Sequence, residues 1–242
     1  GPYVPPDAGR RPRRRDVDLD QLEREMATLL DLATSGDLFR VPPFDAVPPE
    51  LRRLRDIAFS GDGEPTTEPL FPEAVARLAK LKAARGLEDV KLVLITDATR
   101  LQAPEVVRGL ELLMAHQGEI WAKLDAGTEA YYRAINRTKV PFSRILDNLR
   151  ATSLRWPITI QTLFLGWKGQ GPSEGEVDAY VACIRALREA GGRIQAIQLY
   201  TVARPTPEPE ARPLPMAEMD RLAGRVKDQL PDLPVEVFYG PA

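Results

Sequence analysis

The order of the apolar segments is the feature that most constrains how this chain can fold. From residue 56 onward, short apolar runs of strand length alternate with longer segments in which apolar residues recur every three or four positions. A period of about 3.6 residues is typical of helices, whereas short unbroken apolar runs are typical of buried strands. The alternation therefore predicts an α/β fold in which helical crossovers join parallel strands of one sheet.

Six apolar runs are predicted as strands, and helices are predicted between them. The predicted strands are residues 56–60, 91–96, 119–125, 157–165, 194–201 and 235–239. The predicted helices of this region are residues 74–85, 104–117, 128–135, 141–149, 173–191 and 219–230. A further helix is predicted between an N-cap at Asp18 and a C-terminal glycine at Gly36. Residues 205–215 are Pro-rich and are predicted as a loop.

Composition divides the chain into an arm and one folded domain. Residues 1–16 are rich in Pro and Arg, and we expect a basic arm there that is either simply solvated or contacts phosphate or RNA. Residues 17–242 are expected to form a single folded domain.

Charge and rare residues exclude several classes of function. The formal net charge of −2 gives no general indication of nucleic acid or membrane binding. No apolar run approaches the roughly 20 residues that span a bilayer, and no signal peptide is recognisable, so we expect a cytoplasmic protein without membrane contact. A single cysteine, Cys183, and a single histidine, His116, exclude a disulfide framework and a cluster of Cys or His metal ligands.

Polar residues gather where the predicted strands end. In parallel α/β folds, ligands bind at the carboxyl ends of the strands. The candidates at these ends are Ser60, Asp62, Glu64, Thr96, Asp97, Lys123, Asp125, Gln161, Gln198 and Tyr200. Carboxylates suit an amine, Lys123 suits a carboxylate, and amides and hydroxyls suit a ribose or a base. Taken singly, each is better explained as an ordinary loop or supporting residue, and it is their occurrence at five strand ends that favours a site.

The turn at residues 60–64 is the most distinctive of these ends. Gly61 and Gly63 flank Asp62, and a proline follows Glu64. Glycine lets backbone approach a ligand closely, and the proline biases Glu64 toward an extended conformation. The turn suits an ammonium group better than a phosphate, which would favour a lysine and a row of N–H groups. The alternative is a polar loop between strand and helix.

No catalytic side chain and no metal ligand is predicted with any specificity. Cys183 and Trp121 are expected to pack against neighbouring side chains. The carboxylates offer an alternative, a site for Mg²⁺ or Ca²⁺ in a metal-dependent hydrolase. That site would use Asp62, Glu64, Asp97 and Asp125.

Three stretches together resemble the radical SAM enzymes. Phe-Ser-Gly-Asp-Gly-Glu-Pro-Thr at residues 59–66 resembles the Gly-Gly-Glu motif of that family, and residues 95–99 look like its Thr-Asn-Gly stretch, with Asp97 in place of Asn. Residues 121–128, followed by Ile-Asn-Arg at 135–137, are similar to a segment in the branch related to wyosine-type tRNA synthetases. The likeness extends from about residue 16 to residue 239.

The resemblance implies a fold, two cofactors and partners. The fold would be a partial (β/α)6 TIM-like barrel that binds S-adenosylmethionine beside a [4Fe–4S] cluster and generates a 5′-deoxyadenosyl radical for hydrogen abstraction. A tRNA base is one candidate substrate, and flavodoxin or ferredoxin is the kind of reductant expected. By position, the cofactor would contact Ser60, Gly61, Asp62, Gly63, Glu64, Thr96, Asp97, Lys123, Asp125, Gln161, Gln198 and Tyr200.

One departure from the family is large. The family holds its cluster with three cysteines, spaced C-x3-C-x2-C, after the first barrel strand, and neither that strand nor that loop is recognisable here. We therefore expect the core of a radical SAM enzyme without its cluster-binding segment, inactive by itself. The alternative is a degenerate barrel without a cluster, which would bind a nucleoside-like ligand or a partner without catalysis.

Overall fold

The computed structural model describes residues 17–61, 63–203 and 208–240. These residues form two compact units, one up to Arg53 and one from Leu54 onward, and each is considered by itself. The basic arm predicted at residues 1–16 and the predicted site residue Asp62 lie outside the described residues.

The N-terminal unit contains one long helix and three short 3-10 helices. They are α1 (Leu19–Ser35), η1 (Asp37–Arg40), η2 (Phe44–Ala46) and η3 (Pro49–Leu51). The carboxylate of Asp18 caps α1 by accepting hydrogen bonds of 3.0 Å from the backbone N–H groups of Asp20 and Gln21. The helix ends at Gly36, whose φ of +81° is left-handed. Both predicted ends of this helix are confirmed.

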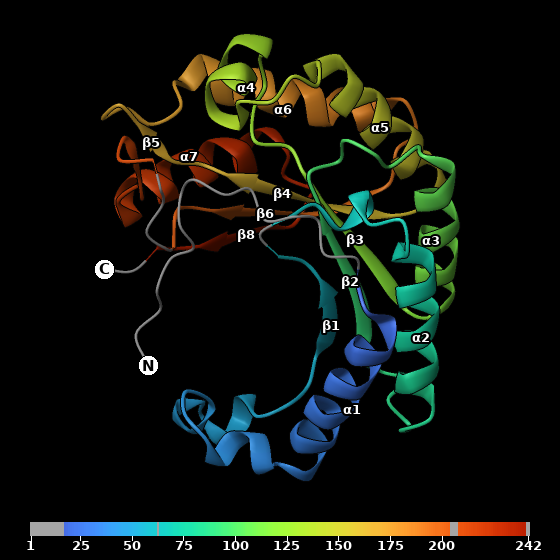
Figure 1. Cartoon of the computed structure of the whole chain (residues 1–242). Helices are drawn as coiled ribbons and strands as arrows, with labels where there is room; N and C mark the ends of the chain where they lie inside the picture. Colours follow the sequence, from blue (N-terminus) through green and yellow to red (C-terminus); the bar gives the residue numbers. More distant parts are fainter. Residues whose placement is uncertain (1–16, 62, 204–207, 241–242) are drawn as a thin grey trace. The chain divides into compact units, whose positions relative to one another are not determined.

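The C-terminal unit is built on a six-stranded parallel sheet, which confirms the predicted α/β fold. The strand order is β1-β2-β3-β4-β6-β8, so each of these strands pairs with the one before it in the chain (Figure 1). The strands are β1 (Asp56–Phe59), β2 (Lys91–Thr96), β3 (Gly118–Lys123), β4 (Ile158–Leu163), β6 (Ile194–Tyr200) and β8 (Val235–Phe238). Strand β2 was recognisable as an apolar run because its consecutive residues Leu92, Val93 and Leu94 are all fully buried.

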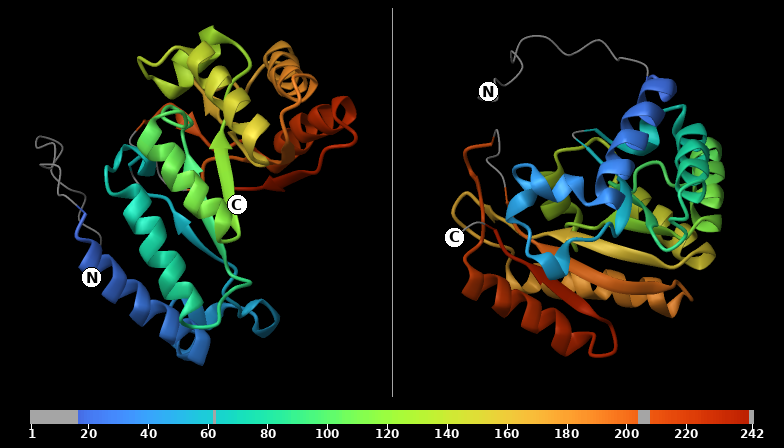
Figure 2. Two further views of the ribbon diagram at one scale, coloured as in Figure 1. Left: turned by 90° about the vertical axis from the view of Figure 1, so that its right-hand side faces the viewer. Right: turned by 90° about the horizontal axis from the view of Figure 1, so that it is seen from below.

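Helices cover the outer face of this sheet, as Figures 1 and 2 show. They are α2 (Phe71–Ala83), α3 (Pro104–Ala115), α4 (Glu129–Asn136), α5 (Phe142–Arg155), α6 (Glu174–Glu189) and α7 (Met216–Gln229), with the 3-10 helix η4 (Pro65–Thr67) after β1. The core lies between helices and sheet, where Val75, Leu110, Leu149, Val181 and Val226 are fully buried. Burying one such side chain stabilises the fold by about 1.5–3 kcal/mol. No described helix is long and apolar enough to cross a membrane.

The sheet remains open, as expected for a partial barrel. Among the described strands, β1 and β8 form its two edges and do not pair with each other. A second, two-stranded sheet joins β5 (Gly166–Trp167) to β7 (Ala211–Arg212) in antiparallel fashion. The loop predicted at residues 205–215 therefore contains a strand. Two residues are too few for a periodic pattern, so this strand pair could not be read from the sequence.

A buried lysine organises the end of the sheet opposite the predicted site. Lys82 on α2 is 3% exposed. Its ammonium donates hydrogen bonds to the carbonyl oxygens of Glu88 at 3.1 Å, His116 at 3.2 Å and Val90. Burial lowers the pKa of Lys82, although Glu88 and Asp89 act in the opposite direction. The three carbonyls use all three donors of the side chain.

Candidate ligand-binding site

The structure separates the predicted site residues into two groups. Ser60, Gly61, Gly63, Glu64, Thr96, Asp97 and Asp125 lie at the ends of β1, β2 and β3 and are called the edge group. Lys123, Gln161, Gln198 and Tyr200 instead line one pocket on the face of the sheet that the helices leave open. The side chains of both groups come from the C-terminal unit alone.

Glu64 joins two of the predicted turns. Its Oε1 accepts hydrogen bonds from the hydroxyl of Thr96 at 2.7 Å and from the hydroxyl and N–H of Thr66 at 2.6 and 3.1 Å. Its Oε2 accepts from the backbone N–H of Asp97 at 2.7 Å. The carboxylate expected to bind an ammonium is thus engaged by protein donors and fastens the turn after β1 to the turn after β2.

The turn after β2 is held in a strained conformation. Ala98 is fully buried with a φ of +65°, and left-handed backbone costs a residue with a Cβ about 1–2 kcal/mol. Asn148 of α5 secures it by donating to the carbonyl oxygens of Ala98 at 2.8 Å and Thr99 at 3.0 Å. The Asp97 carboxylate accepts from the N–H and hydroxyl of Thr99 at 2.9 and 2.7 Å. Asp97 itself is exposed and available to a ligand.

Asp125 connects the ends of β3 and β4. It is 6% exposed, and its two oxygens accept from the N–H of Leu163 at 2.8 Å and from the amide of Asn136 at 3.0 Å. Burial raises the pKa of Asp125, while these two hydrogen bonds and the nearby charge of Lys123 oppose that effect. Asp125 was predicted to approach the ligand, and in the structure its buried carboxylate connects the segments that form the site.

A further acidic residue, Glu176 of α6, was missed at the sequence level. Its carboxylate accepts from the N–H of Gly127 at 2.5 Å and from the N–H and hydroxyl of Thr128 at 3.1 and 2.6 Å. Ser173 caps α6 by accepting from the N–H of Glu176 at 3.2 Å, but the Glu176 side chain does not return to the N-cap as it would in a full capping box. A Cβ at Gly127 would lie 2.0 Å from the backbone nitrogen of Tyr180. The loop after β3 is thus clamped against α6.

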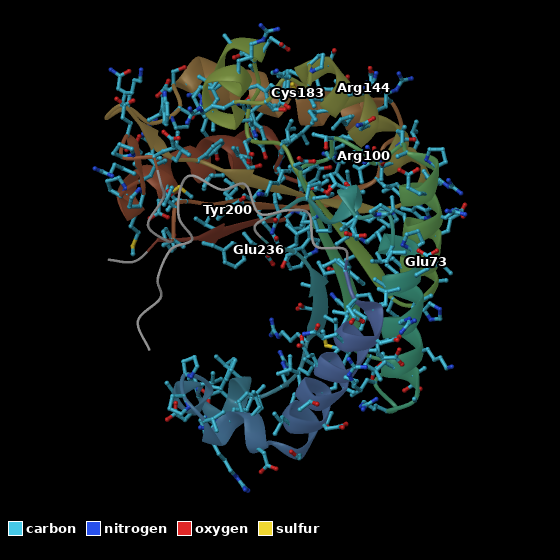
Figure 3. The ribbon with its side chains drawn as sticks, viewed as in Figure 1. Glu73, Arg100, Arg144, Cys183, Tyr200 and Glu236 are labelled. Carbon is cyan, nitrogen blue, oxygen red and sulfur yellow. The ribbon has the colours of Figure 1, made fainter. Side chains whose placement is uncertain are left out.

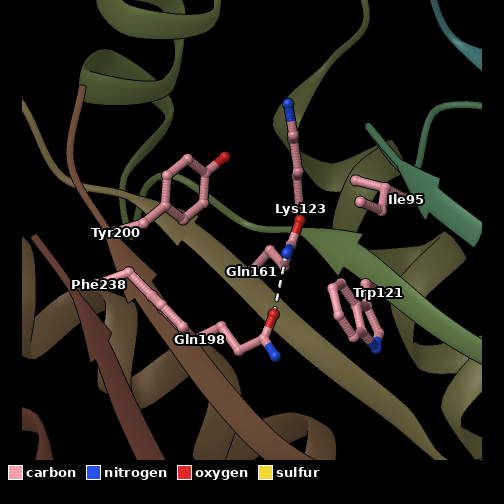
Figure 4. Close-up of a pocket in the computed structure, with 7 residues that line it drawn as sticks. All are labelled: Ile95, Trp121, Lys123, Gln161, Gln198, Tyr200 and Phe238. Atoms are coloured by element: carbon pink, nitrogen blue, oxygen red, sulfur yellow. Dashed lines mark hydrogen bonds between the residues drawn. The ribbon is translucent and has the colours of Figure 1, made fainter. Parts of the chain in front are cut away.

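The pocket has a volume of about 370 Å³ and opens on the sheet face (Figure 4). Strands β2, β3, β4, β6 and β8 all contribute to it. Its lining residues are Ile95, Trp121, Lys123, Gln161, Gln198, Tyr200 and Phe238. We call it the sheet pocket.

A polar row crosses the floor of the sheet pocket. Strand register aligns Lys123 with Gln161, Gln161 with Gln198, and Gln198 with Glu236. The amide of Gln161 donates to Oε1 of Gln198 at 2.9 Å, and the amide of Gln198 donates to Glu236 over a longer 3.4 Å. Figure 3 shows Tyr200 and Glu236 on the inner side of the sheet. The row therefore has an ammonium at one end and a carboxylate at the other.

Aromatic side chains border this row. Trp121 lies on one side, with its indole N–H donating to Glu119 at 2.9 Å, and Tyr200 and Phe238 lie on the other (Figure 4). Burial, followed by the charge of Asp125, raises the pKa of Tyr200, so its hydroxyl stays protonated. Trp121 was expected to pack against neighbouring side chains, but the period-two alternation along β3 puts it on the same face as Lys123. That alternation was the signal that sequence reasoning did not use.

The described residues offer no set of ligands for a metal ion or an iron–sulfur cluster. No group of three or more His, Cys, Asp or Glu side chains there is arranged to hold a metal ion. Cys183 lies half-buried on α6, with its sulfur 3.6 Å from the carbonyl oxygen of Gly127. Burial, followed by the charge of Glu176, raises the pKa of its thiol. One half-buried thiol does not fit the several thiolates that a [4Fe–4S] cluster requires.

Comparisons with known proteins define the fold. No protein-family model and no curated protein matches the sequence. Among solved structures, the chain is similar to the crystal structure of archaeal TYW1, with a TM-score of 0.54 and 15% sequence identity. The similarity covers 94% of this chain and 68% of that chain. At this identity the likeness concerns the fold alone, and it agrees with a partial TIM-like barrel.

Proposed function

We propose that the C-terminal unit binds S-adenosylmethionine at the edge group, as the core of a radical SAM-type protein. One observation carries the proposal: Glu64 fastens the two turns that bear the family-like motifs into a single structure at the carboxyl edge of the sheet. The fold shared with archaeal TYW1 agrees with the branch that the motifs resemble.

The chemistry of the edge group suits the amino-acid end of this cofactor. Ser60, Gly61 and Gly63 are exposed, and apart from the chain neighbours no described residue has a heavy atom within 4 Å of where a Cβ would stand on either glycine. Backbone carbonyls there are therefore accessible to an ammonium group. The exposed carboxylate of Asp97 adds a negative charge on the neighbouring strand end.

These residues alone cannot carry out the radical step. A single cysteine does not hold a cluster, so the cluster ligands would have to come from outside this sequence. Hydrogen abstraction, a tRNA base as its substrate and a flavodoxin- or ferredoxin-type reductant belong to the proposal only for a protein that supplies such ligands. For this chain, the proposed activity is cofactor binding.

Equilibrium dialysis with labelled S-adenosylmethionine tests the binding. We expect the chain to bind the cofactor and Asp97→Lys to abolish binding, because a cation would replace the acid that faces the ammonium. Asp147→Lys is the matched control, since Asp147 is exposed on α5 and lies outside the edge group. The proposal fails if the unmodified chain does not bind, or if both variants bind alike while thermal melts show them folded.

The second candidate is a binding module that never carries a cluster. The single cysteine favours it. Iron and labile sulfide are to be measured on the protein isolated anaerobically from its native cells. About four of each per chain would support the radical enzyme. Absence of both, with cofactor binding intact, would support the module.

A further inference from the structure

We propose that the chain forms a two-fold symmetric dimer through the outer face of α5 and α6, with a second copy of the chain as the partner. The inference does not rest on the function proposed above, and it concerns the side of these helices that faces away from the sheet. Two observations carry it, namely a groove between α5 and α6 and the order of exposed residues along α5.

The groove lies between α5 and α6 on the outer side of the C-terminal unit. Figures 1 and 2 show the two helices next to one another in the outer layer, and the groove has a volume of about 500 Å³. The space is left open because α6 presents three alanines and the only cysteine of the chain to it. The apolar side chains that line it are Leu146, Ala179, Ala182, Cys183, Ala186 and Leu187. We call it the outer groove.

Two opposite charges of α5 lie at the rim of the outer groove. Asp147 and Arg150 both line it and are both exposed. Neither forms an ion pair or a side-chain hydrogen bond with any described residue. They are three positions apart, which is about one helical turn. An acid and a base one turn apart on a helix are complementary to the same helix running in the opposite direction.

The order of exposed residues extends this complementarity along α5. The exposed positions are Ser143, Asp147, Arg150 and Leu154. Gaps of four, three and four positions put them in one line along the helix. A two-fold axis between positions 148 and 149 would bring Asp147 of one copy opposite Arg150 of the other. The same axis would bring Ser143 opposite Leu154. Each contact recurs on the other side of the axis, as a symmetric interface requires.

The sizes of the side chains also suit a second copy. Leu154 is apolar yet 47% exposed, and the small Ser143 opposite it leaves room to cover it, which removes apolar surface from water. The axis also places α6 of one copy over α6 of the other. The alanines of the outer groove then allow the two helices to approach closely. An unrelated partner would have to reproduce this order of charges and sizes, whereas a second copy supplies it by symmetry.

Analytical ultracentrifugation of the full chain tests the dimer. We expect a monomer–dimer equilibrium in sedimentation velocity at protein concentrations up to about 1 mM, because interfaces of ordinary area span a wide range of affinity. Asp147→Arg and Arg150→Asp should each weaken the dimer by about 30-fold or more, since every substitution acts twice across the axis and sets like charges opposite each other. Asp228→Arg is the matched control, because Asp228 is exposed on α7 outside the outer groove, and it should dimerise as the unmodified chain does.

Two further measurements distinguish a charge contact from a general disturbance of the helix. Asp147→Arg mixed with Arg150→Asp should form a heterodimer, because one rim is then wholly positive and the other wholly negative. The double variant, which carries both substitutions in one chain, should form a homodimer again, because the two charges have only exchanged places. Thermal melts verify that each variant is folded.

Cys183 reports on the outer groove directly. It is the only cysteine of the chain and lies half-buried in the groove, so a second copy should cover it. We expect its alkylation by N-ethylmaleimide, followed by mass spectrometry, to slow as the protein concentration rises through the range in which the dimer forms. In Asp147→Arg the rate should be the same at all of these concentrations.

Three results would overturn the assignment. They are a chain that stays monomeric at about 1 mM, a dimer that the charge variants weaken no more than Asp228→Arg does, and single variants that do not associate when they are mixed. None of these measurements involves S-adenosylmethionine. Asp147→Lys should break the dimer and still bind S-adenosylmethionine, because it alters only the outer groove, so failure of the dimer is distinguishable from failure of the function proposed above.

Discussion

The Glu64 carboxylate accepts a 2.7 Å hydrogen bond from the backbone N–H of Asp97, and so links turns that follow two different strands. Its other oxygen holds the hydroxyl of Thr96. Asn148 also secures the turn after β2, so the link matters most for the turn after β1. The shape of the edge group therefore depends on a side chain that itself has little capacity left for a ligand.

Glu64→Gln should loosen both turns. The glutamine has one acceptor oxygen where the carboxylate has two, so a donor among Thr66, Thr96 and Asp97 loses its partner. We expect the free energy of unfolding to fall by about 1–3 kcal/mol, measured by urea denaturation. Glu73→Gln, at an exposed position on α2, should change it by less than about 0.5 kcal/mol. Equal effects of the two changes would argue against the linking role.

The raised pKa of Asp125 predicts that stability falls as pH rises above the ordinary pKa of a carboxyl group. Its folded-state pKa is raised above the ordinary value of 3.8, chiefly by burial, so the folded state binds the proton more tightly than the unfolded state. Its contribution is then fully present below pH 3.8 and is lost as pH rises through the raised pKa. In Asp125→Asn this loss should disappear from unfolding curves measured between pH 4 and pH 7, whereas exposed Asp147→Asn should retain it. A pH profile unchanged by Asp125→Asn would contradict the raised pKa.

Lys82→Met should destabilise the end of the sheet away from the site. Methionine fills a similar volume but leaves the carbonyl oxygens of Glu88, Val90 and His116 without their donor. Since each buried unpaired group costs about 1–3 kcal/mol, we expect a loss of about 3 kcal/mol or more. Lys80→Met, on the exposed side of the same helix, is the control. A loss below about 1 kcal/mol in Lys82→Met would mean that water replaces the ammonium.

Two glycines should respond to alanine with opposite signs. Gly127→Ala sets a methyl group 2.0 Å from the backbone nitrogen of Tyr180, and we expect a loss of about 3 kcal/mol from overpacking. Gly175, in the first turn of α6, has only the Ser173 hydroxyl at 4.0 Å, so Gly175→Ala should stabilise by up to about 1 kcal/mol. Differential scanning calorimetry measures both. Comparable melting temperatures would show that the loop after β3 can move away from α6.

The fold was more predictable than the site, for a physical reason. Strands such as β2 are apolar and buried, and helices such as α6 repeat at 3.6 residues, so local pattern and tertiary burial agree there. The predicted helix at 141–149 was too short only because α5 continues to Arg155 through polar residues that still face the core, such as Thr152 and Ser153. Two-residue strands such as β5 carry no period at all.

At the site, the sequence indicates which residues end strands but not how they pair. Glu176 belongs to a helix pattern 48 positions from its partner Thr128, and nothing local marks that contact. Trp121 and Lys123 were both visible, yet only the alternation along β3 assigns them to one face. Asp125 and Glu64 connect parts of the site by accepting hydrogen bonds from other elements. These donors come close to the two carboxylates only when the strands are assembled.

The strand order also determines which wall of the sheet pocket can yield. Strands β3, β4 and β6 each have a hydrogen-bonded neighbour on both sides, whereas β8, among the described strands, has one on a single side. Amides of an edge strand exchange with solvent more readily than those of interior strands, because fewer bonds must break to release them. Phe238 lies on β8 and is 49% exposed, so it forms the more mobile wall of the pocket. Trp121 on β3 forms the more rigid wall.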